Sequence, residues 1–371
     1  MRIAFYAPLK SPHHPTPSGD RSMARLLIKA LEAGGHEVEV ISELRSLETA
    51  GSREAQISIE HDAAQERVQL KELPSSRANG RAEYDLWFTY HHYYKAPDFL
   101  GFELARHWGI PYLLAEASHA PKRLVGPWAD WARFTEAGIR EADKVLYMTG
   151  FDRVCLEPLV VTENLISFPP FLDAKPFLDR PVTRSRTPDL TRLLSVAMMR
   201  PGDKVESYRR LAHSLERLKD WSWHLTIAGD GPDRSMVEGL FQALPEEKVA
   251  FIGAVEPGDL PALYAEADLF LWPGAGEAYG MVYLEAAASG LGVLAQNIRG
   301  VPDVVIDGST GILTPDDDQT AYANALLSLL EHPEKQAAMG EAGREFVSTE
   351  RDLPRAAARL NRLFQEMGLG Q

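Results

Sequence analysis

Two glutamates in a glycine-rich part of the chain, Glu277 and Glu285, are spaced so that their carboxylates could bind one ligand. The apolar run 269–272 indicates a strand, Glu277 falls in the loop after it, and Glu285 falls in a helix. This order leaves the first backbone amides of the helix without partners, and an anionic group is favoured there. Carboxylates beside those amides can accept hydrogen bonds from hydroxyl groups. The pattern therefore indicates a nucleotide-sugar site, with phosphate on the amides and sugar hydroxyls on the carboxylates.

The helix geometry defines the surroundings of Glu285. It follows Met281 by four residues and Val282 by three, so the three side chains share one face of the helix. Small alanines after Glu285 let the helix pack close to a sheet, where burying an unpaired carboxylate is costly. A ligand partner for Glu285 is the resulting hypothesis. The alternative is that Glu285 is a solvated helix residue and Glu277 a loop acid, since two acids are common at any fixed spacing.

Composition and charge limit the class of protein. The chain has 371 residues, which suggests about two domains, and its formal net charge of −14 argues against a nucleic-acid partner. Cys155 is the only cysteine, so no disulfide can form within the chain and a reducing compartment is expected. No apolar run has the length of a signal peptide or a membrane span. These features predict a cytoplasmic protein; peripheral contact with the inner face of a membrane and the oligomeric state are left open.

Short apolar strands alternate with amphipathic helices in two series along the chain. The first series has strands at 3–6, 38–41, 85–90, 112–115 and 144–148. The second has strands at 193–197, 223–228, 249–252, 269–272, 292–295 and 311–313. Residues 45–81 are charged and weakly periodic, and they are predicted to be an insertion with one helix and one short strand. Asp20 is predicted to cap the first helix. The alternation favours parallel sheets covered by helices on both faces.

Two such series predict an α/β protein with two Rossmann-like domains that face each other across a cleft. Ligands of open α/β sheets bind beyond the C-terminal ends of the strands. The first domain is placed at 1–180 and the second at 188–350, with a proline-rich linker between them. A final helix at about 353–365 has no strand after it, so 353–371 is expected to pack back onto the first domain.

Several ordered motifs resemble those of family 4 retaining glycosyltransferases of the GT-B fold. They are the glutamate pair and the segments 227–232, 272–274, 299–305 and 308–313. The resemblance implies a retaining, metal-independent hexosyltransferase of carbohydrate biosynthesis. It would move a sugar from a nucleotide-sugar to a hydroxyl of a saccharide, lipid-linked or small-molecule acceptor, without a cofactor. A UDP-sugar is preferred over a GDP-sugar as the donor. Another reaction of the same fold, such as nucleotide-sugar epimerisation or hydrolysis, and a non-catalytic sugar-nucleotide-binding protein are the alternatives.

The resemblance also implies which residues of the second domain bind the donor. Glu285 would accept hydrogen bonds from the ribose, and Glu277 would contact hydroxyls of the donor sugar. The sugar and the diphosphate would meet the backbone of Tyr279, Gly280, Met281 and Val282, and the base would meet the backbone of Gly253 and Ala254.

Positive charge beside the leaving diphosphate is a further implication. Lys204 matches the lysine of the family, but the position of the family arginine falls on Met198. Arg200, two residues later, is expected to supply that charge, because two cations there would stabilise the charge that develops on the phosphate. Gly19, at the start of the first helix, would face the diphosphate from the other domain. Glu277, Arg200 and Lys204 are the expected catalytic residues of the second domain.

A histidine near the reacting sugar completes the implied catalytic set. The position of the family histidine falls on Ala117, so His119 is expected to line the active site instead. The two positions lie on the same side of an extended chain. Glu116 and Ser118 are the other candidates at this strand end.

Aromatic residues of the first domain point to the acceptor. The run 90–94 could shape the acceptor cleft. His91 and His92 within it follow a strand end, but they rank below His119 as active-site residues because lone histidines are more often structural. Trp128 and Trp131 have i, i+3 spacing and are predicted to bury against the first sheet. The alternative for this aromatic and basic segment is docking to a membrane surface or stacking on a sugar acceptor.

Overall fold

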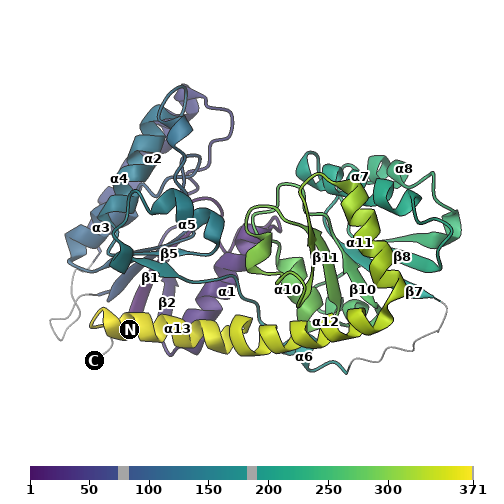
Figure 1. Cartoon of the computed structure of the whole chain (residues 1–371). Coiled ribbons are helices and arrows are strands. Elements are labelled where there is room, and N and C mark those ends of the chain that lie inside the picture. The colour runs from purple at the N-terminus through teal and green to yellow at the C-terminus, as the bar shows by residue number, and fades with distance from the viewer. Residues whose placement is uncertain (74–82, 182–189, 370–371) are drawn as a thin grey trace. The chain divides into compact units, whose positions relative to one another are not determined.

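The computed structural model describes residues 1–73, 83–181 and 190–369. They form two compact units, one of Met1–Pro169 with Leu353–Gln371 and one of Pro170–Asp352 (Figure 1). Each unit contains a six-stranded sheet whose neighbouring strands are parallel. This is the architecture that the alternating pattern predicts. Among the helices of the described residues, none combines the length and the apolar character needed to cross a membrane.

The sheet of the first unit has the strand order β2-β1-β3-β4-β5-β6. Its strands are β1 (Arg2–Tyr6), β2 (Glu37–Val40), β3 (Leu86–Tyr90), β4 (Tyr112–Ala115), β5 (Lys144–Tyr147) and β6 (Leu165–Ser167). Phe5 lies opposite both Val40 and Phe88, and its ring stacks on that of Phe88 with the centroids 5.6 Å apart. Every residue of β3 and β4 is buried, as expected for parallel strands covered on both faces.

Helices of the first unit follow the strands in sequence. They are α1 (Gly19–Ala33), α2 (Arg53–Lys71), α3 (Gly101–Trp108), α4 (Ala129–Glu141), α5 (Gly150–Leu156) and α13 (Leu353–Glu366). The prediction that Asp20 caps α1 is wrong: Ser18 has the extended backbone of a cap and accepts a hydrogen bond from the Arg21 amide at 3.2 Å. The short strand predicted within 45–81 is absent from residues 45–73, which contain α2; residues 74–82 lie outside the described part.

The C-terminal helix α13 returns to the first unit, as predicted, and lies beside α1 (Figure 1). Asn361 Nδ2 donates to the carbonyl of Gly34 at 3.0 Å, and Asn361 Oδ1 lies 2.7 Å from His36 Nε2. The His36 ring also packs edge-on against Phe364, with the centroids 5.2 Å apart. Leu360 and Phe364 are each 1% exposed. The apolar face of α13 therefore completes the core of a unit whose other elements lie more than 180 residues earlier in the chain.

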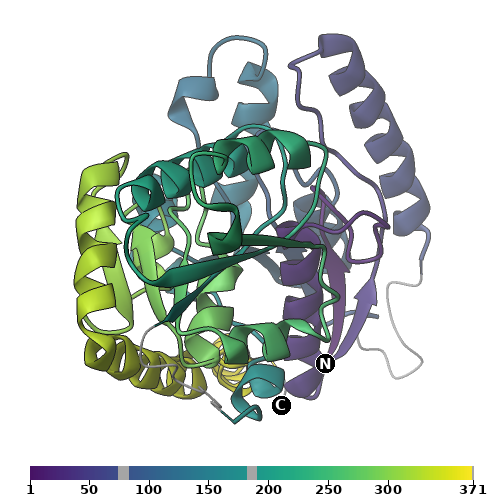
Figure 2. The same cartoon turned by 90° about the vertical axis from the view of Figure 1, so that its right-hand side faces the viewer.

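The second unit has the strand order β12-β11-β10-β7-β8-β9. Its strands are β7 (Thr191–Val196), β8 (Trp223–Ala228), β9 (Val249–Gly253), β10 (Leu269–Leu271), β11 (Gly292–Gln296) and β12 (Gly311–Thr314). Its helices are α6 (Lys175–Leu178), α7 (Asp203–Glu216), α8 (Arg234–Leu240), α9 (Leu260–Glu266), α10 (Met281–Ala288), α11 (Gln319–Glu331) and α12 (Pro333–Phe346). Figure 2 turns this unit toward the viewer, with α11 and α12 in yellow-green beside the sheet. Buried apolar residues of β10 and β11 form the centre of its core.

Residues 170–180, placed in the first domain from the sequence, pack on the second unit. The Phe177 ring lies edge-on to Tyr264 with the centroids 5.8 Å apart, and the Leu178 carbonyl accepts from Arg344 Nη2 at 2.7 Å. Pro176 stands in the first turn of α6, where the missing backbone amide of proline breaks no helical hydrogen bond. Pro176 is therefore part of a short helix and not of the predicted linker. The chain therefore enters the second unit at Pro170.

Trp128 and Trp131 of the first unit are buried, as their spacing predicts. Trp128 is 4% exposed and Trp131 is 1% exposed. Trp131 Nε1 donates to Glu60 Oε1 at 2.7 Å, and the Trp131 ring packs on Phe99 with the centroids 5.3 Å apart. Neither tryptophan presents a ring face to solvent, so the alternative in which these rings stack on an acceptor or enter a membrane does not hold.

Candidate active site

Three glycines shape the loop between β10 and α10, and each has a conformation that other residues avoid. Gly274, Gly276 and Gly280 have φ of 80°, 67° and 78°. A Cβ on Gly276 would stand 2.1 Å from Asp203 Oδ2, and a Cβ on Gly274 would stand 2.3 Å from Tyr283 Oη. The loop therefore lies directly against α7 and α10, and only glycine allows both the turn and the close approach.

The N-terminus of α10 has the open amides that the sequence predicts. Gly280 is the N-cap and provides no side-chain hydrogen bond, and Met281 and Val282 are half-buried. Tyr279, just before the cap, is 8% exposed. The helix itself packs tightly through its alanines, which are at most 1% exposed. The start of α10 is thus a well-packed helix end without a side-chain cap, which favours an anion.

Glu285 lies on the half-buried side of α10. Its Oε2 accepts a hydrogen bond at 2.9 Å from the hydroxyl of Tyr264, which is fully buried. Burial raises the pKa of Glu285 above its ordinary value, while the bond from Tyr264 opposes that rise. Oε1 has no hydrogen-bond partner among the described residues. The alternative of a solvated helix residue is therefore wrong, and one oxygen of a partly desolvated carboxylate remains available to a ligand.

Glu277 and Lys204, which the sequence places in separate motifs, form an ion pair. The side chains are 15% and 28% exposed, respectively. The same oxygen, Glu277 Oε1, accepts from Trp272 Nε1 at 3.0 Å, and Lys204 Nζ lies 5.4 Å from the centre of the Trp272 ring. Lys204 stands in the first turn of α7, where a cation is mildly unfavourable. The carboxylate offsets that cost and holds the ammonium beside the glycine loop.

Arg200 lies between β7 and α7 and is half-buried. Its neighbour Met199 is fully buried, and the Met199 amide donates to the Asp230 carbonyl at 2.9 Å. A Cβ on Gly231 would stand 2.2 Å from the Met199 carbonyl oxygen, so the loop after β8 packs closely against this segment. The structure thus places Arg200 at the C-terminal edge of the sheet, and its contact with a phosphate stays a prediction.

Gly253 and Ala254 mark the end of β9 at the same edge of the sheet. Gly253 has φ of 78°, and its carbonyl accepts from the Gly229 amide at 2.7 Å. Ala254 is exposed. One lone pair of the Gly253 carbonyl is thus used within the sheet, and contact of a base with this segment stays a prediction.

Gly19 and His119 are the predicted site residues of the first unit, and His119 lies in the loop after β4. Gly19 opens α1, and a Cβ there would meet nothing within 4 Å. His119 is half-buried, and burial lowers its pKa while the charge of Glu136 opposes that change. Ala117, where the resemblance puts a histidine, is fully buried. The role of His119 in an active site stays a prediction.

His91 and His92 follow β3 and differ sharply in their surroundings. His92 is buried: its Nδ1 accepts from the Asp98 amide at 2.7 Å, and its Nε2 lies 3.1 Å from the Thr135 carbonyl, so it has a structural role. His91 Nδ1 instead faces two carboxylates, with Asp20 Oδ1 at 3.4 Å and Glu116 Oε1 at 3.8 Å. Sequence reasoning ranked His91 low. The signal that could have raised the rank of His91 is that His91, Asp20 and Glu116 each come after one of three neighbouring parallel strands.

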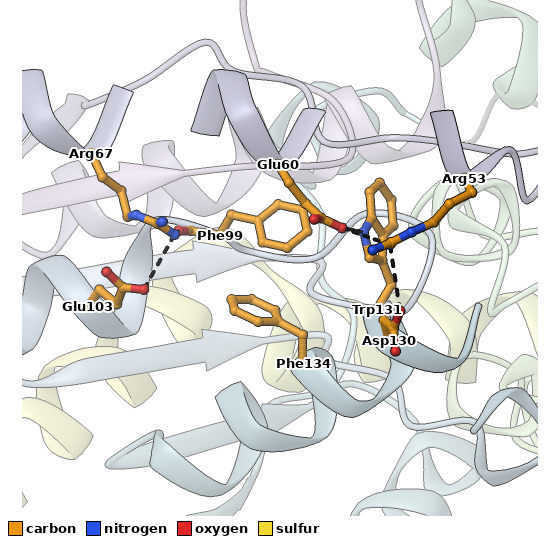
Figure 3. Close-up of a pocket in the computed structure, with 8 residues that line it drawn as sticks. All are labelled: Arg53, Glu60, Arg67, Phe99, Glu103, Asp130, Trp131 and Phe134. Carbon is orange, nitrogen blue, oxygen red and sulfur yellow. Dashed lines mark hydrogen bonds and ion pairs between the residues drawn. The ribbon is translucent and has the colours of Figure 1, made fainter. Parts of the chain in front are cut away.

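A cavity of about 340 Å³ lies among α2, α3 and α4 of the first unit (Figure 3). Figure 3 shows the rings of Phe99 and Phe134 between two charged groups. In one group Arg53 Nη1 is 3.3 Å from Glu60 Oε1, and the other contains an ion pair of Arg67 with a glutamate of α3. The charged residues of this cavity pair with one another, and none of the predicted site residues lines it.

Comparison with known proteins shows which protein family the second unit resembles. Residues 187–346 match the family model described as Glycosyl transferases group 1. A GDP-mannose-dependent alpha-(1-6)-phosphatidylinositol monomannoside mannosyltransferase of Mycolicibacterium smegmatis is 33% identical over 226 residues, which cover 56% of this chain and 58% of that protein. The chain covers 24% and 25% of the lengths of two other curated relatives. The matched segment contains the glycine loop, both glutamates and Lys204.

Solved structures resemble the whole chain and not only the second unit. Sucrose-phosphate synthase from Thermosynechococcus elongatus has a TM-score of 0.75 at 19% identity and covers 99% of both chains. An Anabaena protein solved in complex with UDP has a TM-score of 0.74 at 16% identity and covers 99% of this chain and 100% of its own. This likeness over the whole chain, together with the two parallel six-stranded sheets, confirms the predicted α/β fold class of two Rossmann-like domains.

Proposed function

We propose that this protein is a retaining, metal-independent glycosyltransferase of family 4 that transfers a hexosyl group from a nucleotide-sugar to an acceptor hydroxyl. The observation that carries the proposal is the uncapped start of α10 with Glu285 on the same helix and Glu277 in the loop before it. At the C-terminal edge of this sheet, the helix amides match the phosphates of such a donor, the carboxylates match its hydroxyls, and the lysine matches its negative charge. The match of residues 187–346 to the glycosyltransferase model supports it.

The ion pair of Lys204 with Glu277 indicates how the site would respond to a donor. A diphosphate carries more negative charge than one carboxylate, so it would attract Lys204, with Arg200 as the second cation. Glu277 Oε1 would then be released to accept hydrogen bonds from the donor sugar. Glu285 Oε1, which has no partner among the described residues, would accept from the ribose. The backbone of Gly253 and Ala254 would meet the base, and Gly19 of the first unit would contact the diphosphate.

The reaction would proceed by departure of the nucleoside diphosphate and attack of the acceptor hydroxyl on the same face of the sugar. The leaving phosphate would take the proton of that hydroxyl. Lys204 and Arg200 would stabilise the charge that develops on the leaving group, and the other residues, with His119 as a candidate from the first unit, would position the reactants. No cofactor takes part in this scheme.

The donor base and the acceptor class are part of the proposal. The proposed donor is a UDP-sugar. GDP-mannose is its direct competitor, because the mannosyltransferase of Mycolicibacterium smegmatis is GDP-mannose-dependent. The acceptor is a saccharide, a lipid-linked sugar or a small molecule. The reaction is placed in the cytoplasm, since the chain has a single cysteine and so cannot form an internal disulfide; a lipid-linked acceptor would add peripheral contact with a membrane.

A thermal-shift panel of UDP-, GDP- and ADP-sugars tests the donor site. We expect one nucleotide to raise the melting temperature, because a ligand that binds only the folded state stabilises it. The shift should disappear in Glu285→Ala and persist in Glu341→Ala, which changes an exposed glutamate of α12 in the same unit. Stabilisation by no nucleotide, or equal stabilisation of both variants, would contradict the proposal. Release of free or epimerised sugar without an acceptor would favour hydrolysis or epimerisation.

A further inference from the structure

The backbone at His91 and Glu116 is strained in a way that directs both side chains to one place. His91 has φ of 65° and Glu116 has φ of 56°, two of the four positive values at non-glycine residues in the described part of the chain. Each amide still belongs to the sheet: His91 donates to the Ala115 carbonyl and Glu116 to the Leu146 carbonyl, both at 2.9 Å. The chain therefore makes a sharp turn immediately after the last backbone hydrogen bond of each strand. Such strain persists only where the surroundings hold it, and it is concentrated at functional sites.

The His91 ring is mostly buried but keeps part of its surface exposed. Nδ1 is buried, faces Asp20 and Glu116, and makes no hydrogen bond of normal length, while 19% of the side chain is exposed. The Tyr93 ring packs against the imidazole with the centroids 4.9 Å apart. Burial alone would lower the pKa of His91, but its close contact with the Asp20 carboxylate and the charge of Glu116 raise it. The carboxylates favour a proton on Nδ1, so Nε2 accepts a hydrogen bond in the neutral ring and donates one in the protonated ring, which the raised pKa favours.

We propose that His91 binds a hydroxyl group of a sugar acceptor through Nε2, and that Asp20 and Glu116 are the positioning residues that hold its ring. The inference rests on the proposed function, because that function defines the acceptor. A sugar hydroxyl both donates and accepts hydrogen bonds, so it fits Nε2 in either protonation state of the ring, whereas the two carboxylates would repel a phosphate. The three residues stand at the C-terminal ends of β1, β3 and β4 or in the helix that follows, where ligands of such sheets bind. The proton of the reacting hydroxyl goes to the leaving phosphate, so none moves to His91.

The kinetic test separates acceptor binding from donor binding. His91→Asn is the informative variant, because asparagine tolerates a positive φ but lacks an atom at the place of Nε2. We expect it to raise the KM for the acceptor about tenfold, the effect of one lost hydrogen bond, and to leave the KM for the donor within about twofold. His91→Gln, whose amide can reach the place of Nε2, should recover part of the loss. Asp20→Asn and Glu116→Gln should raise the acceptor KM less, and the matched control His107→Ala, at an exposed histidine of α3, should not change it.

An NMR titration tests the same contact without requiring turnover. The imidazole Cε1–H resonance of His91, assigned by its absence from His91→Asn, is followed during addition of methyl glucoside, methyl mannoside, methyl galactoside and myo-inositol. We expect at least one of these probes to shift the His91 resonance while that of His107 stays in place. No shift with any probe, or an acceptor KM in His91→Asn equal to that of the parent, would overturn the inference.

The two tests distinguish the inference from the proposed function. A probe that shifts the His91 resonance in a protein that transfers no sugar would support the binding site and contradict the transferase. Transfer to a probe that leaves the His91 resonance unmoved would support the transferase and contradict the role of His91. A rise of the donor KM equal to that of the acceptor KM would also contradict it, since that pattern indicates a general disturbance of the fold.

Discussion

Lys204 and Glu277, 73 positions apart in the sequence, meet in an ion pair whose carboxylate also accepts a hydrogen bond from Trp272. The ammonium stands in the first turn of α7, where a cation is mildly unfavourable, and the carboxylate offsets that cost. Because both residues are expected to contact the donor, the pair links the group that would bind phosphate to the group that would bind sugar.

We expect Lys204→Met to lower kcat/KM for the donor by about 100-fold, because removing one stabilising group from a developing charge has an effect of this size. The free energy of unfolding should change by less than about 1 kcal/mol, since a partly exposed ion pair contributes little. Steady-state kinetics and urea denaturation measure the two effects. Lys219→Met, at an exposed lysine of the same unit, is the control. Activity in Lys204→Met equal to that of the control would exclude the phosphate role.

The glycine loop should tolerate no side chain at Gly276. Its φ is 67° and an added Cβ would stand 2.1 Å from Asp203 Oδ2, so Gly276→Ala should lower the free energy of unfolding by about 1–3 kcal/mol. Gly258→Ala is the matched control, because its Cβ would meet nothing within 4 Å. Urea denaturation of the two variants provides the measurement. Equal stability of the variants would show that the loop is less constrained than its geometry indicates.

Docking of α13 should contribute strongly to the stability of the first unit. Phe364 is 1% exposed and contacts His36, so Phe364→Ala should cost about 3–5 kcal/mol. Gln365→Ala, at the adjacent exposed position, should change the stability by less than about 0.5 kcal/mol. Hydrogen exchange of the α1 amides reports on this unit separately from the second. If exchange of α1 were unchanged in Phe364→Ala, the helix would not be part of that core.

The pH dependence of the free energy of unfolding should reveal the raised pKa of Glu116. Burial raises its pKa from 4.5 to about 7, so the folded state holds its proton more tightly than the unfolded state. Its stabilising effect is complete below pH 4.5 and is lost as the pH rises to about 7. The raised pKa of His91 acts in the same direction.

A variant without this carboxyl should lose most of that dependence. Relative to the parent, Glu116→Gln should become more stable by about 1–3 kcal/mol between about pH 5 and about pH 8. Chemical denaturation across this range measures the difference, and Glu54→Gln at an exposed site of α2 is the control. A difference that does not vary with pH would contradict the assignment of the raised pKa.

Much of the fold was predictable because it depends on local patterns. Alternating apolar runs predicted the parallel strands, with β6 as an omission, and the final helix without a following strand was expected to return to the first unit. The loop and helix around Glu277 and Glu285 were also predictable, since a strand, a run of glycines and an alanine-rich segment determine each step within about twenty residues. The errors were local too: Ser18 and not Asp20 caps α1, and Pro176 starts a helix.

The sequence by itself determined the α/β class, most strand positions and the glycine loop with its two glutamates, because short-range periodicity and backbone preference decide them. The tertiary structure alone decided which distant side chains meet. It paired Lys204 with Glu277, covered one oxygen of Glu285 with Tyr264, and brought Asp20 and Glu116 to His91. The physical reason is that such contacts depend on which strands become neighbours and on where each strand ends, and both follow from the packing of the whole sheet.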